Sequence, residues 1–213
     1  MHNRNIPAIS LTCVKRNFPS GKLRSRSALA IFAVLFAFVV LSVQPVMTYG
    51  QDTTEVKQKI TDACKRVFGE NVVIEIHQIL LDDSALARIK GLAQVHYAKT
   101  VGLYAAKVNG KVAGYGIVDN VRGKERNITY MLIVGTDLKV KDLEVLFYRE
   151  QYGGEVESET WRNQFKGKSA SDNVRVGGNI ENISGATIST NNITYGVKKL
   201  LYVFQVLQER KLL

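Results

Sequence analysis

An uncharged apolar run, Ala28–Val43, divides this chain and limits what can fold on either side of it. Residues 1–50 contain six basic residues and no acidic residue, so they contribute +6 to the formal net charge of +10 of the 213-residue chain. The run is intermediate in length between the apolar part of a signal peptide and a full membrane span. Because basic residues precede the run and none follows it directly, the N-terminus is expected in the cytoplasm and the main domain outside.

Two fates of this segment stay open. Thr48-Tyr49-Gly50 has small residues at positions compatible with signal cleavage, whereas Pro45-Val46-Met47 extends the apolar length and favours a retained anchor. If the segment is retained, we expect the domain on the outer (periplasmic or extracellular) face of the cytoplasmic membrane. If the segment is cleaved, we expect the domain to be secreted to that compartment. We therefore expect a basic cytoplasmic tail (1–27), a signal or transmembrane segment (28–47) and an exported domain (51–213), with a helical lead-in at 53–69 and a core at 100–210.

The exported part shows both helical and strand periodicity. Apolar residues recur at helical spacing before Gly69, and again on one face of a last helix, at Ile193, Val197, Leu200, Leu201, Phe204 and Leu207. Strands are expected at 72–81, 101–108, 111–118, 128–134 and 140–148, and short helices near 84–92 and 159–165. Asn109-Gly110 is the favoured two-residue turn of a β-hairpin. The pattern predicts an α+β domain, an antiparallel sheet flanked by helices.

Several classes of site are disfavoured by the residues present. The folded part has no basic run interleaved with aromatic residues, so nucleic-acid binding is not expected. The two cysteines, Cys13 and Cys64, lie on opposite sides of the apolar run and form no disulfide framework, and no Cys-x-x-Cys-His is present for c-type haem. Cys64 is predicted to be a core residue. The histidines His77 and His96 lack metal-ligand spacing, so no metal site is predicted.

The string Ser184-Gly-Ala-Thr-Ile-Ser-Thr190 directly precedes the last helix and contains four hydroxyl side chains. Unpaired N–H groups and the dipole at a helix N-terminus favour a bound phosphate, and Gly185 lacks the Cβ that would keep the backbone away from it. An ordinary helix cap is the alternative. Ser, Thr and Asn are the preferred capping residues, and four residues could serve: Ser189, Thr190, Asn191 and Asn192.

Residues 184–190 resemble the flavin-attachment motif of the FMN-binding domain family, which includes the flavin subunits of the Rnf complex and of the sodium-pumping NADH:quinone reductase. The resemblance spans about 101–207 and extends to an upstream segment, at Tyr148-Arg149-Glu150, Gly153-Gly154-Glu155, Trp161 and Gln164-Phe-Lys-Gly-Lys168. The family usually has an aspartate three residues before the serine, where this chain has Glu181.

The resemblance implies that Thr187 is esterified to the phosphate of FMN. A separate, magnesium-dependent flavin transferase performs that reaction in the family, with FAD as donor and AMP as leaving group, so no catalytic residue is expected in this chain. Residues around Thr187 are then expected to bind the cofactor, namely Ser184, Gly185, Ala186, Ser189, Thr190, Glu150, Gly153, Gly154, Trp161 and Phe165. Trp161 and Phe165 are candidate walls for the flavin ring or plain core residues, and Gly153-Gly154 permits close backbone approach to the ring or forms a flexible turn. Glu150 fixes loop geometry, touches the flavin or is a solvated surface acid.

These expectations define a membrane-associated electron-transfer flavoprotein with covalent FMN. Its implied partners are the flavin transferase and membrane redox proteins, with the N-terminal segment in the membrane. Two alternatives stay open: a flavin-dependent reductase acting directly on a small substrate, and a non-redox interaction module. The sequence shows no acid–base pair near the motif, so a carrier is favoured over a stand-alone enzyme.

Overall fold

The structure is a computed structural model that describes residues 49–213. The expected cytoplasmic tail and apolar segment lie outside the described residues. No helix between residues 49 and 213 combines the length and apolarity needed to cross a bilayer.

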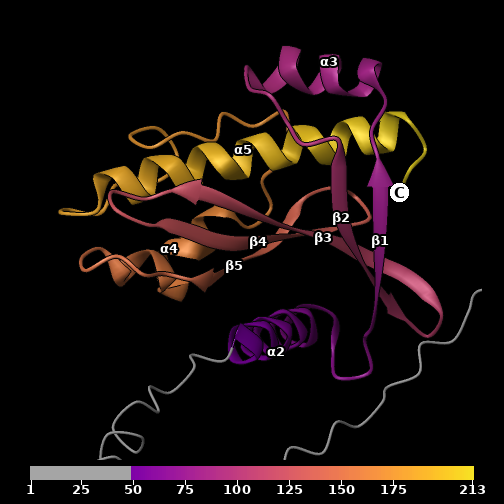
Figure 1. The fold of residues 1–213 in the computed structure, drawn as a ribbon, viewed down its shortest axis with the longest axis horizontal. Coiled ribbons are helices and arrows are strands. Elements are labelled where there is room, and N and C mark those ends of the chain that lie inside the picture. The colour runs from indigo at the N-terminus through magenta and orange to yellow at the C-terminus, as the bar shows by residue number, and fades with distance from the viewer. Residues whose placement is uncertain (1–48) are drawn as a thin grey trace, which may run out of the picture. The chain divides into compact units, whose positions relative to one another are not determined.

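A five-stranded antiparallel sheet forms the centre of the domain, with the strands in sequence order, as Figure 1 shows. The strands are β1 (Val73–Leu80), β2 (Thr100–Val108), β3 (Lys111–Arg122), β4 (Asn127–Gly135) and β5 (Val140–Phe147). The helices are α2 (Tyr49–Phe68), α3 (Asp83–Ala93), α4 (Glu159–Arg162) and α5 (Thr187–Glu209), with short 3-10 turns at Gly154–Glu157 and Asn163–Phe165. The expected α+β class and the antiparallel sheet flanked by helices are confirmed.

Local signals explain several element ends. Asn109 and Gly110 both have positive φ, at 52° and 76°, and make the turn of the predicted hairpin between β2 and β3. Asp82 caps α3 by accepting a hydrogen bond from the Ala85 N–H at 2.6 Å. The lead-in helix α2 ends before Gly69, which has a φ of 95°.

Helices cover both faces of the sheet, and β4 is buried on each side. Alternate β4 residues, including Tyr130 and Leu132, pack with α5 and α3, whereas Met131 and Ile133 pack with α2. In Figure 1 α5 and α2 lie on opposite faces of the sheet. Cys64 of α2 is buried, as predicted, and burial raises the pKa of its thiol to about 11. The long helix α5 is therefore held along its length, and its first turn lies at one fixed end of the sheet.

Candidate functional site at the start of helix α5

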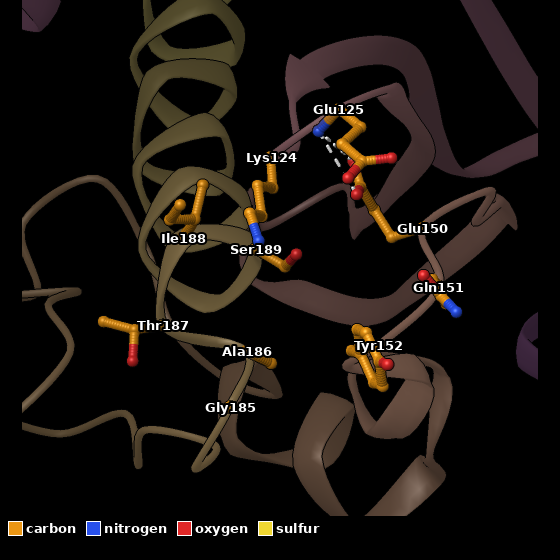
Figure 2. Close-up of a pocket in the computed structure, with 10 residues that line it drawn as sticks. All are labelled: Lys124, Glu125, Glu150, Gln151, Tyr152, Gly185, Ala186, Thr187, Ile188 and Ser189. Atoms are coloured by element: carbon orange, nitrogen blue, oxygen red, sulfur yellow. Dashed lines mark hydrogen bonds between the residues drawn. The ribbon is translucent and has the colours of Figure 1, made fainter.

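Three segments distant in sequence enclose a pocket of about 380 Å³ at the start of α5. The loop between β3 and β4 contributes Lys124 and Glu125, the loop after β5 contributes residues 150–152, and the entrance of α5 contributes residues 185–189. Figure 2 shows the side chains of these segments around the pocket, with Thr187 on the side of the helix entrance away from Glu150 and Tyr152. The volume is within the range of about 300–1,000 Å³ typical of small-ligand pockets.

Helix α5 begins without a side-chain cap. Its N-cap position is Ala186, which has no capping side-chain hydrogen bond, and the preceding Gly185 has a φ of 82°. The sequence allowed four capping residues between Ser189 and Asn192, but all of them lie inside the helix. That alternative is wrong, because the helix starts earlier than the capping residues. The first-turn N–H groups have no intrahelical acceptor, so they offer donors to an anion.

The four hydroxyl groups of the string fall into two pairs. Ser189 and Thr190 are buried, whereas Ser184 and Thr187 are exposed. The Ser189 hydroxyl lies 3.1 Å from the Tyr148 hydroxyl, which itself donates to the Tyr152 carbonyl at 2.5 Å. Burial raises the pKa of the Tyr148 phenol, so it remains a donor at neutral pH. The buried pair holds the helix entrance in place, and the exposed pair stays open to reaction.

Glu150 fixes the loop between β3 and β4. Its carboxylate accepts the Arg126 N–H at 2.7 Å and the Glu125 N–H at 2.9 Å. The hydrogen bond from the Arg126 backbone lowers the pKa of Glu150, so the carboxylate is ionised at neutral pH. Gly123 permits this approach, because a Cβ there would lie 2.1 Å from the Glu150 Oε1. Of the three roles expected for Glu150, the structure supports the structural one, and it also places the residue in the pocket lining.

Gly153 lets two loops meet beside the pocket. A Cβ on this residue would lie 2.5 Å from the Ala186 Cβ and 2.7 Å from the Tyr148 hydroxyl, and its φ is 87°. Gly153 therefore permits a close approach of its loop to Ala186 at the start of α5. Gly154 is exposed, and a Cβ there would come no nearer than 3.8 Å to Glu157.

The aromatic pair Trp161 and Phe165 belongs to the core. Their rings meet edge to face with centroids 5.2 Å apart, and both side chains are buried. Neither residue lines the pocket at α5. Of the two roles left open by the sequence, the geometry favours plain core. Trp161 nevertheless fixes the backbone that leads into the site, since its Nε1–H donates to the Glu181 carbonyl at 2.9 Å.

Several pocket residues escaped the sequence reasoning. Tyr152 and Ile188 keep 72% and 48% of their surface exposed although both are apolar, and they provide the broad side chains of the pocket wall. Both adjoin residues that the sequence did single out, which is a signal that could have found them. Lys124 had no such signal, because its loop reaches the pocket only through strand pairing. Among residues 49–213 no three histidine, cysteine or acidic side chains gather as a metal site would require.

Comparison with known proteins identifies what this chain resembles. Residues 123–202 match the FMN-binding domain family. The crystal structure of Shewanella oneidensis NqrC aligns with 75% of this chain and 99% of its own, at 15% identity and a TM-score of 0.53, which shows a shared fold. The corresponding C component of the Na⁺-translocating NADH-quinone reductase of Parabacteroides distasonis aligns with 74% of this chain and 98% of its own, at 14% identity and a TM-score of 0.44. No curated protein sequence matches the chain.

Proposed function

We propose, from the match of residues 123–202 to the FMN-binding domain family, that this chain is an electron-transfer flavoprotein with FMN esterified to Thr187. The observation that carries the proposal is the uncapped entrance of α5, where an exposed threonine hydroxyl lies at the edge of a ligand-sized pocket. The first-turn N–H groups, which have no other helical partner, would hold a phosphate ester on this hydroxyl.

The residues present fit FMN. Tyr152 and Ile188 offer exposed apolar surface to the ring, which is the usual character of a flavin slot, and Lys124 brings a positive charge to the same pocket. Ser184 and Gly185 would hold the phosphate of a bound FMN, while Ala186, Ser189, Thr190, Gly153 and Glu150 keep the surrounding loops in place. Bound FMN supplies one- and two-electron transfer, which suits an adapter between membrane redox partners.

The attachment reaction does not require a base in this domain. The Thr187 oxygen forms a bond to the flavin-side phosphorus of FAD, the pyrophosphate bond breaks, AMP leaves, and the hydroxyl proton passes to the flavin transferase. The bond prevents loss of the cofactor by diffusion. This matters because we also propose that residues 51–213 work outside the cytoplasm, with residues 28–47 as signal or membrane anchor and residues 1–27 in the cytoplasm.

Covalent attachment is tested by mass and by absorbance. The exported domain, co-expressed with a competent flavin transferase, is expected to gain the mass of one FMN less one water and to keep flavin absorbance after denaturation. Thr187→Val is expected to lose both signals and to keep its melting temperature, whereas the neighbouring exposed hydroxyl variant Ser184→Ala keeps the ester. Absence of flavin from the wild-type domain would contradict the proposal and favour a non-redox module.

Two further measurements separate the remaining alternatives. Turnover of a small soluble substrate by the isolated loaded domain would favour a reductase over a carrier. The intact mass of the protein from its host reports whether residues 1–50 are removed, and membrane fractionation of the same material tests the anchor.

A further inference from the structure

Asn182 is the side chain that connects the attachment threonine to the buried part of the helix entrance. Its Nδ2 donates to the Thr187 Oγ1 at 3.2 Å, and its Oδ1 accepts the Thr190 hydroxyl at 2.9 Å. Thr190 is fully buried, and its hydroxyl also lies 2.7 Å from the Ala186 carbonyl. One amide therefore links an exposed hydroxyl to a fixed one.

The backbone that carries Asn182 is fixed as well. The preceding residue, Glu181, donates its N–H to the Gln164 Oε1 at 2.7 Å and accepts the Trp161 Nε1–H on its carbonyl at 2.9 Å. Trp161 is buried in the core. Two side chains from the α4 region thus clamp both backbone polar groups of one residue, and Asn182 begins from a defined position.

From these contacts we propose that Asn182 is a positioning residue for FMN attachment at Thr187, which rests on the function proposed above. The amide N–H fills one lone pair of the Thr187 oxygen and selects its side-chain rotamer. The hydroxyl proton then points away from Asn182, toward solvent and the base of an incoming transferase. The second lone pair stays free to bond to phosphorus while the bond to AMP breaks.

Asn182 itself is exposed, so it does not shield the threonine from the transferase. Its effect is expected on the rate of the attack and not on docking of the domain. A single hydrogen bond contributes about 1 kcal/mol, which corresponds to about fivefold in rate.

The test is a time course of FMN incorporation into the purified domain by a flavin transferase with FAD and magnesium, followed by intact mass. Asn182→Ala is expected to lower kcat about fivefold, with KM for the domain unchanged. Asn182→Asp keeps the acceptor for Thr190 but cannot donate to Thr187 when ionised, so it is expected to be slow too. Thr190→Val removes the anchor of the amide and slows the reaction, and Thr190→Ser restores it.

Asn191→Ala is the matched control. Asn191 is also exposed, and its Nδ2 donates at 2.8 Å to the backbone carbonyl of Thr187, not to the hydroxyl. Its variant is expected to react within about twofold of wild type, because the hydroxyl contact is intact. Equal rates for wild type and both Asn182 variants, or equal slowing by Asn191→Ala, would overturn the positioning role while leaving the ester in place. A wild-type domain that accepts no FMN would instead remove the proposed function and this inference together.

Discussion

At the scale of single residues, Lys124 lines the pocket at α5, and its positive charge acts on a ligand bound there. Lys124 comes from the loop between β3 and β4 and lines the pocket with Tyr152 and Ile188. Reduction adds negative charge to a flavin, and a nearby cation favours the reduced form. The charge of Lys124 is therefore a determinant of the potential of the proposed FMN.

Lys124→Gln is expected to lower the midpoint potential of the bound flavin. An exposed charge interaction contributes at most about 1 kcal/mol, or about 20 mV for a two-electron couple. Redox titration of the loaded domain measures the shift. Lys211→Gln, just beyond the C-terminal end of the 23-residue helix α5, removes the same charge at a distance and is expected to leave the potential unchanged. A shift of the same size in both variants would mean that net charge, and not the pocket, sets the potential.

Gly153 is a second residue with a sharply defined role. Gly153→Ala places a Cβ 2.5 Å from the Ala186 Cβ on a backbone with a φ of 87°, so both packing and conformation oppose it. We expect a loss of about 2 kcal/mol in the free energy of unfolding, measured by urea denaturation. The adjacent Gly154→Ala, with 3.8 Å to its nearest atom, is the control and is expected to be close to neutral. Equal stability of the two variants would contradict the contact between the loops.

At the scale of elements, the β3–β4 loop depends on a carboxylate from another strand end. Glu150→Ala removes the acceptor of the Glu125 and Arg126 N–H groups, so these two amides are expected to exchange hydrogen faster in NMR measurements at pH 6. Folding lowers the pKa of Glu150, and its contribution is therefore complete above the ordinary glutamate value of about 4.3 and is lost as pH falls through the lower folded value.

The pH dependence gives this prediction its control. Below the folded pKa the wild-type carboxylate is protonated, so wild type and Glu150→Ala are expected to converge in acid. Glu155→Ala, in the same loop, leaves both hydrogen bonds in place and is expected to match wild type at either pH. A difference between wild type and Glu150→Ala that persists unchanged in acid would contradict the role of the ionised carboxylate.

Most elements of the fold follow from local sequence signals. The Asn109-Gly110 turn and the apolar face of α5 each act over a few residues, and both were predicted. The Asp82 cap is an equally local contact. Element ends were less predictable where tertiary contacts extend them. Strand β3 continues past Val118 to Arg122 because β4 pairs with it along that length, which no pattern within β3 itself encodes.

Some residues of the candidate site could also be predicted from local sequence, whereas others reach the site only through tertiary contacts. The motif at 184–190 and the neighbouring Glu150 and Gly153 could be named from sequence because they lie in recognisable segments. Asn182 joins them only through hydrogen bonds to Thr187 and Thr190, and Lys124 only through the sheet. Trp161 differs from these residues, because the sequence named it as a candidate wall for the flavin ring although its ring packs in the core. Its one contribution to the site is the Nε1–H that donates to the Glu181 carbonyl.

At the scale of the whole domain, one group of ion pairs joins the lead-in helix to the sheet and to the α4 segment behind the site. Arg162 donates to the Leu143 carbonyl at 2.5 Å and to the Glu144 carboxylate at 2.9 Å, and Arg66 of α2 donates to the same carboxylate at 2.6 Å. The side chains of Arg162 and Glu144 are only 13% and 15% exposed, so loss of one partner leaves a charge poorly solvated.

Arg162→Met keeps the apolar length and removes the charge. We expect a loss of about 3 kcal/mol in the free energy of unfolding, because Glu144 and the Leu143 carbonyl lose a buried donor. Arg88→Met is the matched control, since the Arg88–Glu209 pair is 50% and 40% exposed and is expected to contribute less than about 1 kcal/mol. Urea denaturation compares the free energies of unfolding of the two variants.

Arg162 follows Trp161 directly, so Arg162→Met is also expected to speed hydrogen exchange at Glu181, whose N–H donates to Gln164 of the same segment. Lost stability with unchanged exchange at Glu181 would mean that the ion pairs hold α2 to the sheet without supporting the segment that presents Thr187.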